Sequence, residues 1–197
     1  KAEENVANKL ITLDKARNMK HINDFEDELE KIEQKTDLIL SDKQKEAIEA
    51  VNDNNVCIIT GGPGTGKTTI IKVILELYKS KKRKTVLCAP TGRAAKRMTE
   101  TTGEEAKTLH RLLEIGKIEE ERTSKYNDFD VAPLDADVII VDEMSMVDLF
   151  LMNYLVKAIY QGSKLVLVGC RSVAICRTRK CSCRFNKLKK NKDNCIK

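Results

Sequence analysis

The chain lacks long apolar runs, and its aromatic residues are few. Its 197 residues are 41% hydrophobic and 4% aromatic, with no tryptophan. No stretch approaches the roughly 20 apolar residues that span a bilayer, and the residues that follow Lys1 form no apolar signal core. These absences argue against a membrane protein, and we expect a cytoplasmic fragment with no membrane contact. The length and hydrophobic content suffice for the core of one domain.

Before residue 170 the chain has no net positive charge and little cysteine. The net charge is +6, but residues 170–197 hold ten basic side chains against Asp193 alone, which is +9. The residues before them carry 26 basic and 29 acidic side chains, a balance of −3. The whole-chain charge is therefore no argument for a nucleic-acid-binding body. Cysteine usage changes at the same place, since only Cys57 and Cys88 precede residue 170.

A complete phosphate-binding loop is present at residues 61–68 (GGPGTGKT). An apolar run at 56–59 precedes it, and a helical pattern follows from Ile70. The glycines of such a loop turn backbone N–H groups toward a β-phosphate, and the next helix directs its positive end at the same anion. We expect Lys67 to reach the β- and γ-phosphates and Thr68 to hold Mg²⁺. A plain glycine-rich turn explains neither residue.

This loop predicts a site for a nucleoside triphosphate. The residues expected to contact it are Gly62, Pro63, Gly64, Thr65, Gly66, Lys67, Thr68 and Thr69. A dinucleotide-binding loop is excluded, because the third glycine of its G-x-G-x-x-G pattern, counted from Gly64, would fall on Thr69.

Short apolar runs alternate with helical patterns from residue 56 onward. The expected strands are 56–60, 85–89, 137–141 and 164–168, and the expected helices are 67–79, 92–101 and 147–160. Such alternation predicts an α/β fold, with a parallel sheet, flanking helices and right-handed crossovers. The runs at 138–141 and 165–168 are apolar throughout, so we expect them in the centre of the sheet.

Helices are also expected before the sheet. Residues 3–17 and 25–32 are typical of one-sided, solvated helices. Ser41 is a good N-cap for a third helix, which residues 52–55 end. The segments expected on the surface are an excursion at 116–135 and a basic turn at 79–84.

An acidic pair, Asp142 and Glu143, directly follows the apolar strand at 138–141. A carboxylate at the carboxyl end of a strand that neighbours the P-loop strand can take Mg²⁺ through its water shell. The next carboxylate can point at the water in line with the γ-phosphate. We assign Asp142 to the metal and Glu143, with Lys67, to catalysis. Alone, the pair would fit a helix start, but the loop at 61–68 favours the functional interpretation.

A second anion-binding element is expected after the strand at 85–89, where a helix begins among small residues. Backbone N–H groups of Thr91 and Gly92, with the side chains of Arg93 and Lys96, can grip the backbone of single-stranded DNA without reading its bases. A solvated basic helix face is the alternative. A weaker candidate is His110, either as a contact to DNA or the nucleotide network or as a capping or packing residue.

Four segments together resemble the RecD-like ATP-dependent DNA helicases of superfamily 1. They are residues 61–69, 89–95 (APTGRAA), 108–112 (TLHRL) and 141–148 (VDEMSMVD). The resemblance covers about residues 1–169. It implies a RecA-like P-loop NTPase at 37–169, the first of two motor domains, preceded by a short α-helical segment at 1–36.

The resemblance also implies a function. ATP and Mg²⁺ are the expected cofactors, single-stranded DNA the expected partner, and 5′ to 3′ translocation in recombination and repair the expected activity. It adds Gln44 as an adenine contact and places Arg93 in a single-strand contact motif. The second motor domain, which should bring the arginine that stabilises transition-state charge, is missing from this chain. We therefore expect Mg²⁺-ATP binding, little turnover and no unwinding.

The pattern breaks after Gly169. The family continues there with an Asp and a Gln-Leu-Pro segment, whereas this chain reads CRSVAICR. One of the possible codon sets for residues 170–183 encodes a different peptide when the bases GA are placed before it and translation starts at that G. This peptide is Asp-Val-Asp-Gln-Leu-Pro-Ser-Val-Gly-Pro-Gly-Asn-Val-Leu. We interpret residues 170–197 as an out-of-frame, disordered, basic tail that binds polyanions in a salt-dependent way.

Two alternatives stay open. The tail cysteines could bind zinc in a basic nucleic-acid module, although their spacing fits no paired C-x-x-C pattern. The ligands would then be Cys176, Cys181, Cys183 and Cys195. The body could instead be a stand-alone P-loop switch or a small-molecule phosphotransferase. The acidic pair at 142–143 and the segment 89–98 argue against the phosphotransferase.

Overall fold

The computed structural model describes residues 2–17, 20–115 and 131–169. The elements are α1 (Ala2–Lys15), α2 (Phe25–Thr36), α3 (Asp42–Asp53), β1 (Val56–Thr60), α4 (Lys67–Ser80), β2 (Thr85–Ala89), α5 (Gly92–Thr102), β3 (Ala106–Thr108), α6 (Leu109–Leu112), β4 (Val138–Val141), the 3₁₀ turn η2 (Met144–Met146), α8 (Leu149–Ala158) and β5 (Lys164–Gly169). The expected frameshift and the alternative zinc site concern residues 170–197, and the expected surface excursion includes residues 116–130. These residues lie outside the described part of the chain.

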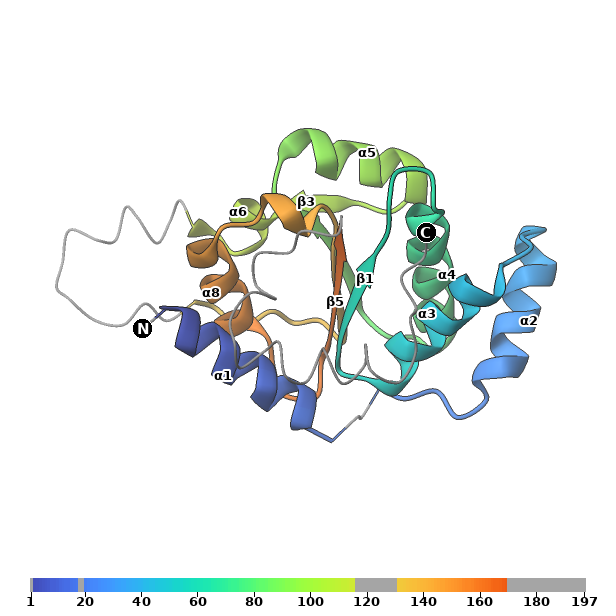
Figure 1. Ribbon diagram of the computed structural model, residues 1–197, viewed down its shortest axis with the longest axis horizontal. Coiled ribbons are helices and arrows are strands. Elements are labelled where there is room, and N and C mark those ends of the chain that lie inside the picture. Colours follow the sequence, from blue (N-terminus) through green and yellow to red (C-terminus); the bar gives the residue numbers. More distant parts are fainter. Residues whose placement is uncertain (1, 18–19, 116–130, 170–197) are drawn as a thin grey trace, which may run out of the picture.

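The five strands form one sheet in the order β1-β5-β4-β2-β3, and all of the pairings are parallel (Figure 1). The predicted α/β fold and the interior positions of the two apolar runs are therefore confirmed. Since the strands are parallel, their carboxyl ends lie at one edge, where the loops that follow β1, β2 and β4 also lie. Among the described helices, none is long and apolar enough to cross a membrane.

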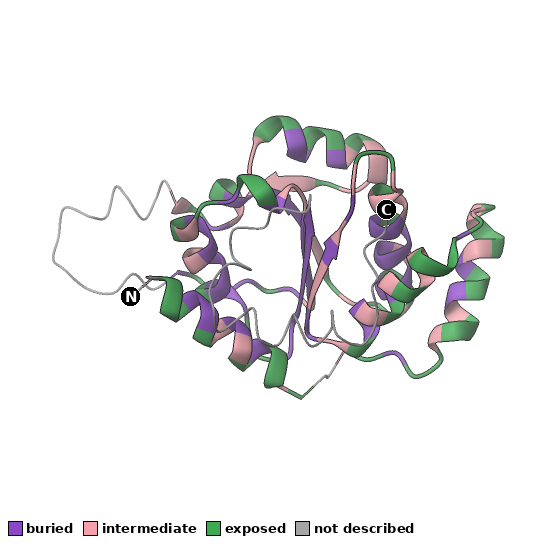
Figure 2. Ribbon diagram, in the orientation of Figure 1, coloured by how far each residue is buried: buried purple, intermediate pink, exposed green. Residues whose placement is uncertain are grey.

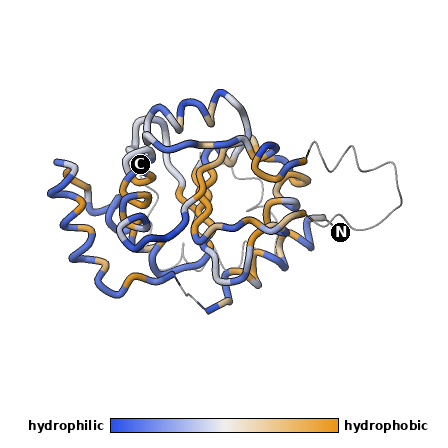
Figure 3. The backbone as a smooth tube through the Cα atoms, turned by 180° about the vertical axis from the view of Figure 1, so that it is seen from behind, coloured by the Kyte–Doolittle hydropathy of each residue, from blue (hydrophilic) through white to orange (hydrophobic). Residues whose placement is uncertain are grey.

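Successive residues of the inner strands face two separate cores, as the period of two in a β-strand requires. Ile139, Val141, Leu165 and Leu167 share one core with side chains of α1 and α8. Val138, Ile140, Val166 and Val168 share the other with side chains of α2, α3 and α4. The strands are accordingly buried and apolar between outer helices that are polar on their solvent side (Figures 2 and 3).

The N-terminal helices pack on these faces. Helix α1 contacts α8, with Val6, Leu10 and Leu13 buried in the first core. Helix α2 contacts α4 through buried Leu29 and Ile32. Both helices are apolar on one side, as their spacing predicted. The division of the chain at residue 36 stays a prediction.

The structure differs from the expectations in three places. Strand β3 and helix α6 were not predicted, because three and four residues are too short to show a period. Helix α8 begins at Leu149, not 147, because the side chain of Asp148 caps it by accepting from the N–H of Leu151 at 2.7 Å. The described end of the 116–135 excursion is not superficial, since Val131 and Leu134 are buried.

A buried lysine joins β5 to the end of α3. Lys164 is 1% exposed, and its Nζ donates to the carbonyl oxygens of Asn52 and Asn54 at 2.8 Å each. These are among the last carbonyls of α3, which have no partner within the helix. Burial lowers the pKa of the Lys164 ammonium from its usual value to about 8.

Lys164 should give the fold an alkaline stability gain. Its folded-state pKa is depressed, so between about pH 8 and 10.5 the unfolded chain binds more protons and stability rises with pH. Urea unfolding from pH 7 to 10 should show the wild type gaining up to about 3 kcal/mol relative to Lys164→Met. A difference between the two proteins that does not change with pH would contradict this.

Candidate nucleotide-binding site

The loop at 61–66 joins β1 to the first turn of α4. Gly64 and Gly66 have φ of +75° and +79°, a region that favours glycine, and Gly66 is the N-cap of the helix. These two turns wrap the loop around the N-terminus of a helix of 14 residues. The first backbone N–H groups of such a helix have no partner within it, and its dipole favours an anion there.

Lys67 lies folded into this loop. Its Nζ donates to the carbonyl oxygens of Gly61 at 2.8 Å and Gly62 at 2.7 Å, and Thr65 Oγ1 donates to the Gly62 carbonyl at 2.9 Å. The ammonium is thereby held against the backbone of the loop. A phosphate oxygen would be a stronger partner than a carbonyl, because it carries a negative charge that attracts the ammonium. Thr68, on the first turn of α4, is exposed.

Gln44 lies against the same loop, from α3. A Cβ built on Gly66 would sit 2.2 Å from Gln44 Nε2, so the amide occupies the space beside the Gly66 backbone. The other end of the amide completes a capping box. The N–H of Ser41 donates to Gln44 Oε1 at 2.9 Å, and the predicted N-cap role of Ser41 is confirmed.

The acidic pair follows β4, but its strand does not neighbour the P-loop strand. The expectation of adjacent strands is wrong, because β5 lies between β1 and β4. Two strand spacings, roughly 10 Å, therefore separate the two strands. This distance suits a carboxylate that meets a metal through water, as assigned to Asp142, better than one that ligates it together with Thr68.

The turn after β4 has an unusual backbone conformation at Glu143. Glu143 adopts the left-handed conformation, with φ +53° and ψ +41°, and its N–H donates to Asp142 Oδ1 at 2.8 Å. Such a conformation costs a non-glycine residue about 1–2 kcal/mol and is characteristic of functional sites. It turns the chain into η2, which contacts β5.

Gly169, at the end of β5, has a structural role at the site that the sequence analysis did not assign. Its carbonyl oxygen accepts from the N–H of Gly61, the first residue of the loop, at 3.3 Å. On its other side, a Cβ would lie 3.4 Å from both the Cβ and the N of Met144. The residue therefore spaces the phosphate-binding loop from the acidic turn. A glycine that ends an apolar strand was the available signal.

The predicted DNA-contacting residues gather at the start of α5, on the same sheet edge. Thr91 caps the helix, its Oγ1 accepting from the N–H of Ala94 at 3.2 Å. Gly92, Arg93 and Lys96 are exposed. Lys96 makes only a long, exposed ion pair with Glu100, at 3.9 Å, which contributes little.

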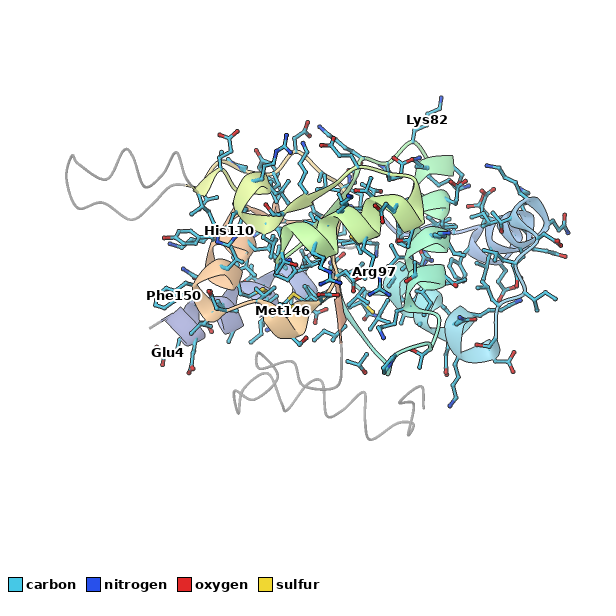
Figure 4. The ribbon with its side chains drawn as sticks, turned by 90° about the horizontal axis from the view of Figure 1, so that it is seen from above. Glu4, Lys82, Arg97, His110, Met146 and Phe150 are labelled. Atoms are coloured by element: carbon cyan, nitrogen blue, oxygen red, sulfur yellow. The ribbon has the colours of Figure 1, made fainter. Side chains whose placement is uncertain are left out.

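Figure 4 looks onto this edge of the sheet, with Arg97 near the middle and Lys82 at the rim. His110 is exposed, so the packing role considered for it is wrong. Lysines of the predicted surface turn are paired instead. Lys81 binds Asp24 at 2.6 Å and Lys84 binds Asp135 at 2.5 Å. Those two ion pairs leave the start of α5 as the more available cationic surface.

The described residues include donors that suit a nucleotide and a hard metal ion. They contain no cluster of three or more His, Cys, Asp or Glu side chains that could hold a metal by itself. The hydroxyl of Thr68 and the carboxylate of Asp142 are hard oxygen donors of the kind that Mg²⁺ takes alongside phosphate oxygens. The two cysteines in the described part of the chain are poor nucleophiles, because burial raises the pKa of the Cys57 thiol to about 12 and also raises that of Cys88.

The fold and this site define an α/β P-loop domain of the RecA-like type. A family model described as an AAA domain matches residues 44–176. This is more than half of the chain, which therefore belongs to that family.

Several curated proteins are similar in sequence to this chain. ATP-dependent RecD2 DNA helicase of Deinococcus radiodurans is 40% identical over 130 residues, covering 66% of this chain and 17% of its own length. The RecBCD enzyme subunit RecD of Buchnera aphidicola is 38% identical over 146 residues, covering 64% and 24%. ATP-dependent DNA helicase dda of phage T4 is 32% identical over 137 residues, covering 66% and 31%. The predicted resemblance to RecD-like helicases is confirmed.

Among solved structures, Pif1 helicases of Candida albicans and Bacteroides give TM-scores of 0.46 and 0.45, at 23% and 25% identity. They cover 67% and 68% of this chain, which spans 32% of each of them. The chain likewise spans only about a sixth of RecD2 and about a quarter of RecD.

Proposed function

We propose that this chain is the Mg²⁺-ATP-binding part of an ATP-dependent DNA helicase of the RecD type, from its first motor domain. The observation that carries the proposal is that one sheet edge presents the loop at 61–68, the acidic pair after β4 and the cationic start of α5. A nucleotide switch needs the first of these, and an ATP hydrolase needs the second. A motor that couples hydrolysis to a nucleic acid needs all three.

Each residue has a separate role in this proposal. The backbone N–H groups of Gly62 and of residues 64–69 hold the phosphates, Lys67 neutralises the β- and γ-phosphates, and Gln44 meets the base. Thr68 and the Asp142 carboxylate hold the metal, which when bound supplies charge stabilisation at the phosphates. Glu143 accepts the proton of the attacking water. Gly169 fixes the distance between the loop and the turn that carries Asp142 and Glu143.

Hydrolysis requires more than these residues. The second motor domain is proposed to close over the nucleotide and to supply an arginine for the charge of the transition state. Met146 and Phe150 follow the acidic turn and are 58% and 70% exposed, respectively, which offers an apolar surface for such a domain (Figure 4). For the chain alone we therefore propose nucleotide binding with little turnover, in the cytoplasm.

Turnover measurements separate this function from the alternatives. Residual ATP hydrolysis by the full chain should increase with single-stranded DNA and should not respond to small-molecule phosphate acceptors. Stimulation by an acceptor would favour the phosphotransferase, and robust DNA-stimulated hydrolysis by this chain alone would contradict the need for a second domain.

The start of α5 should contribute to DNA binding. The double variant Arg93→Ala/Lys96→Ala should bind single-stranded DNA about tenfold more weakly, and the slope of log affinity against log salt should fall by about one to two. The control is Lys72→Ala/Lys82→Ala, which removes the same charge from exposed positions on α4 and in the surface turn. Both variants keep residues 170–197, so any binding by that segment cancels. Equal losses in the two variants would show that only total charge matters.

A further inference from the structure

Strand β1 lies at one edge of the five-stranded sheet (Figure 1). In the described part of the chain it pairs with β5 alone. Three of its five residues are half-buried, whereas every residue of β4 and β5 is buried. Among the described residues, one side of the β1 backbone therefore has no strand beside it.

The hydrogen bonds to β5 determine which backbone groups of β1 remain. The N–H of Leu165 donates to the carbonyl oxygen of Asn55 at one end of the pairing, and the N–H of Gly61 donates to that of Gly169 at the other. Successive residues of a paired strand direct their N–H and C=O groups to opposite sides of the strand, so the odd-numbered residues of β1 face β5. The N–H and C=O groups of residues 56, 58 and 60 are consequently directed at the open edge.

This edge lacks the features by which proteins protect an exposed strand, which are charged side chains, proline, bulges and short length. Residues 56–60 (VCIIT) carry no charge and no proline, and their register with β5 is continuous. The opposite edge strand of the described sheet, β3, is protected in two ways, because it has three residues and Lys107 is one of them. The contrast indicates that β1 is the edge that can accept another strand.

Two copies of β1 are complementary to each other about Ile58. Identical strands that pair across a two-fold axis run antiparallel and use the same surface on both sides. With Ile58 opposite Ile58 of the second copy, Val56 lies opposite Thr60, so each residue with outward groups meets another. Each such pair exchanges two N–H···O bonds. Like charges do not oppose each other, because the strand carries none.

We propose that the open edge of β1 is an interaction surface whose partner is β1 of a second copy of this chain, so that the two sheets join into one. Main-chain hydrogen bonds supply the contact, as in other cases of strand addition. The two loops at 61–66 then lie at opposite ends of the paired strands, and both stay open to a nucleotide. Assembly stops at the dimer, because the short, charged β3 accepts no further copy.

Sedimentation equilibrium of the full chain tests the proposal. The experiment is done at high salt, which screens the net charge of +6. We expect a reversible equilibrium of monomer and dimer with a dissociation constant on the order of 10–100 μM, as suits a small contact surface. A chain that stays monomeric well above this range, or that forms a series of larger species, would overturn the proposal.

Ile58→Pro removes the N–H at the centre of the paired strands. Proline is tolerated in an edge strand where its missing N–H faces away from the sheet, so the bonds to β5 remain. The dimer should dissociate about tenfold more readily or more, because both central hydrogen bonds are lost. Ile58→Val is the matched control, since it keeps the N–H and a β-branched side chain, and it should dimerise within about threefold of the wild type. An unchanged dimer in Ile58→Pro would contradict the proposed register.

Hydrogen exchange in the wild type gives a second test that depends on no variant. Measured by NMR, the amides of Val56, Ile58 and Thr60 should exchange about threefold or more slowly above the dissociation constant than below it. The amides of Cys57 and Ile59 face β5 and should not respond to protein concentration. If the slower exchange falls on other residues and spares these three, the copies meet through a different surface and the proposal is wrong.

Discussion

Replacing Lys67 by alanine lowers the affinity of the chain for Mg²⁺-ATP by about 100-fold or more, the expected cost of removing charge-assisted hydrogen bonds to two phosphates. The physical reason is that Nζ is already held against the loop by the Gly61 and Gly62 carbonyls. It needs little reorganisation to meet an anion there. Calorimetric titration of ATP into the full chain gives the affinity directly.

The control for Lys67→Ala is Lys72→Ala, which removes an exposed lysine from the same helix. It should change the affinity for ATP by less than about threefold, since an exposed charge is screened by solvent and salt. Thermal unfolding of both variants without nucleotide should give similar midpoints. If Lys67→Ala binds ATP as the wild type does, the loop is not the phosphate site.

Gly66→Ala should disrupt both the loop and the capping box. The φ of +79° costs an alanine about 1–2 kcal/mol, and the new Cβ would lie 2.2 Å from Gln44 Nε2. The glutamine could move only by leaving Ser41, which costs about 1 kcal/mol more. We expect a loss of about 2–3 kcal/mol in the free energy of unfolding, measured by urea denaturation. The affinity for ATP should fall more than tenfold, because the reoriented N–H groups no longer converge on the phosphate.

Gly103→Ala is the matched control for this variant. Gly103 ends α5 with a φ of +76°, and a Cβ built there meets nothing within 4 Å. It carries the same backbone strain without the collision, so it should lose only about 1–2 kcal/mol of stability and no affinity for ATP. Equal destabilisation by the two variants, with ATP binding intact in both, would contradict the role given to the contact between Gly66 and Gln44.

The sequence predicted those elements whose side chains follow a clear period. The apolar runs at 138–141 and 165–168 could only be inner strands, because a sheet covered on both faces needs apolar residues on both sides. The phosphate-binding loop was equally visible, since its residue types are dictated by backbone geometry. Ser41 was identified as an N-cap for the same reason.

The order of the strands could not be predicted in this way. Nothing in the local pattern of 138–141 indicates that β5 will pair between it and β1, because both strands are apolar on both faces and would fit either position. The partnership of Lys164 with the end of α3 was hidden for a related reason. It joins residues 110 and 112 positions apart, which only the tertiary fold brings together.

The capping-box role of Gln44 illustrates a third kind of omission. The spacing Ser41-x-x-Gln44 was present in the sequence, and it is a sufficient signal for a capping box. The resemblance to helicases implies a base contact for the same residue. The structure places its amide oxygen in the helix cap.

We propose that the loop at 61–68 and the acidic turn after β4 form one nucleotide–metal site across the intervening strand β5. The most direct test is the affinity for ATP with and without Mg²⁺, in the wild type and in Asp142→Asn. Mg²⁺ should strengthen ATP binding by about tenfold or more in the wild type, and most of that gain should be lost in Asp142→Asn while binding of metal-free ATP is unchanged or improved. If Asp142→Asn keeps the full gain from Mg²⁺, the acidic turn does not belong to the nucleotide site.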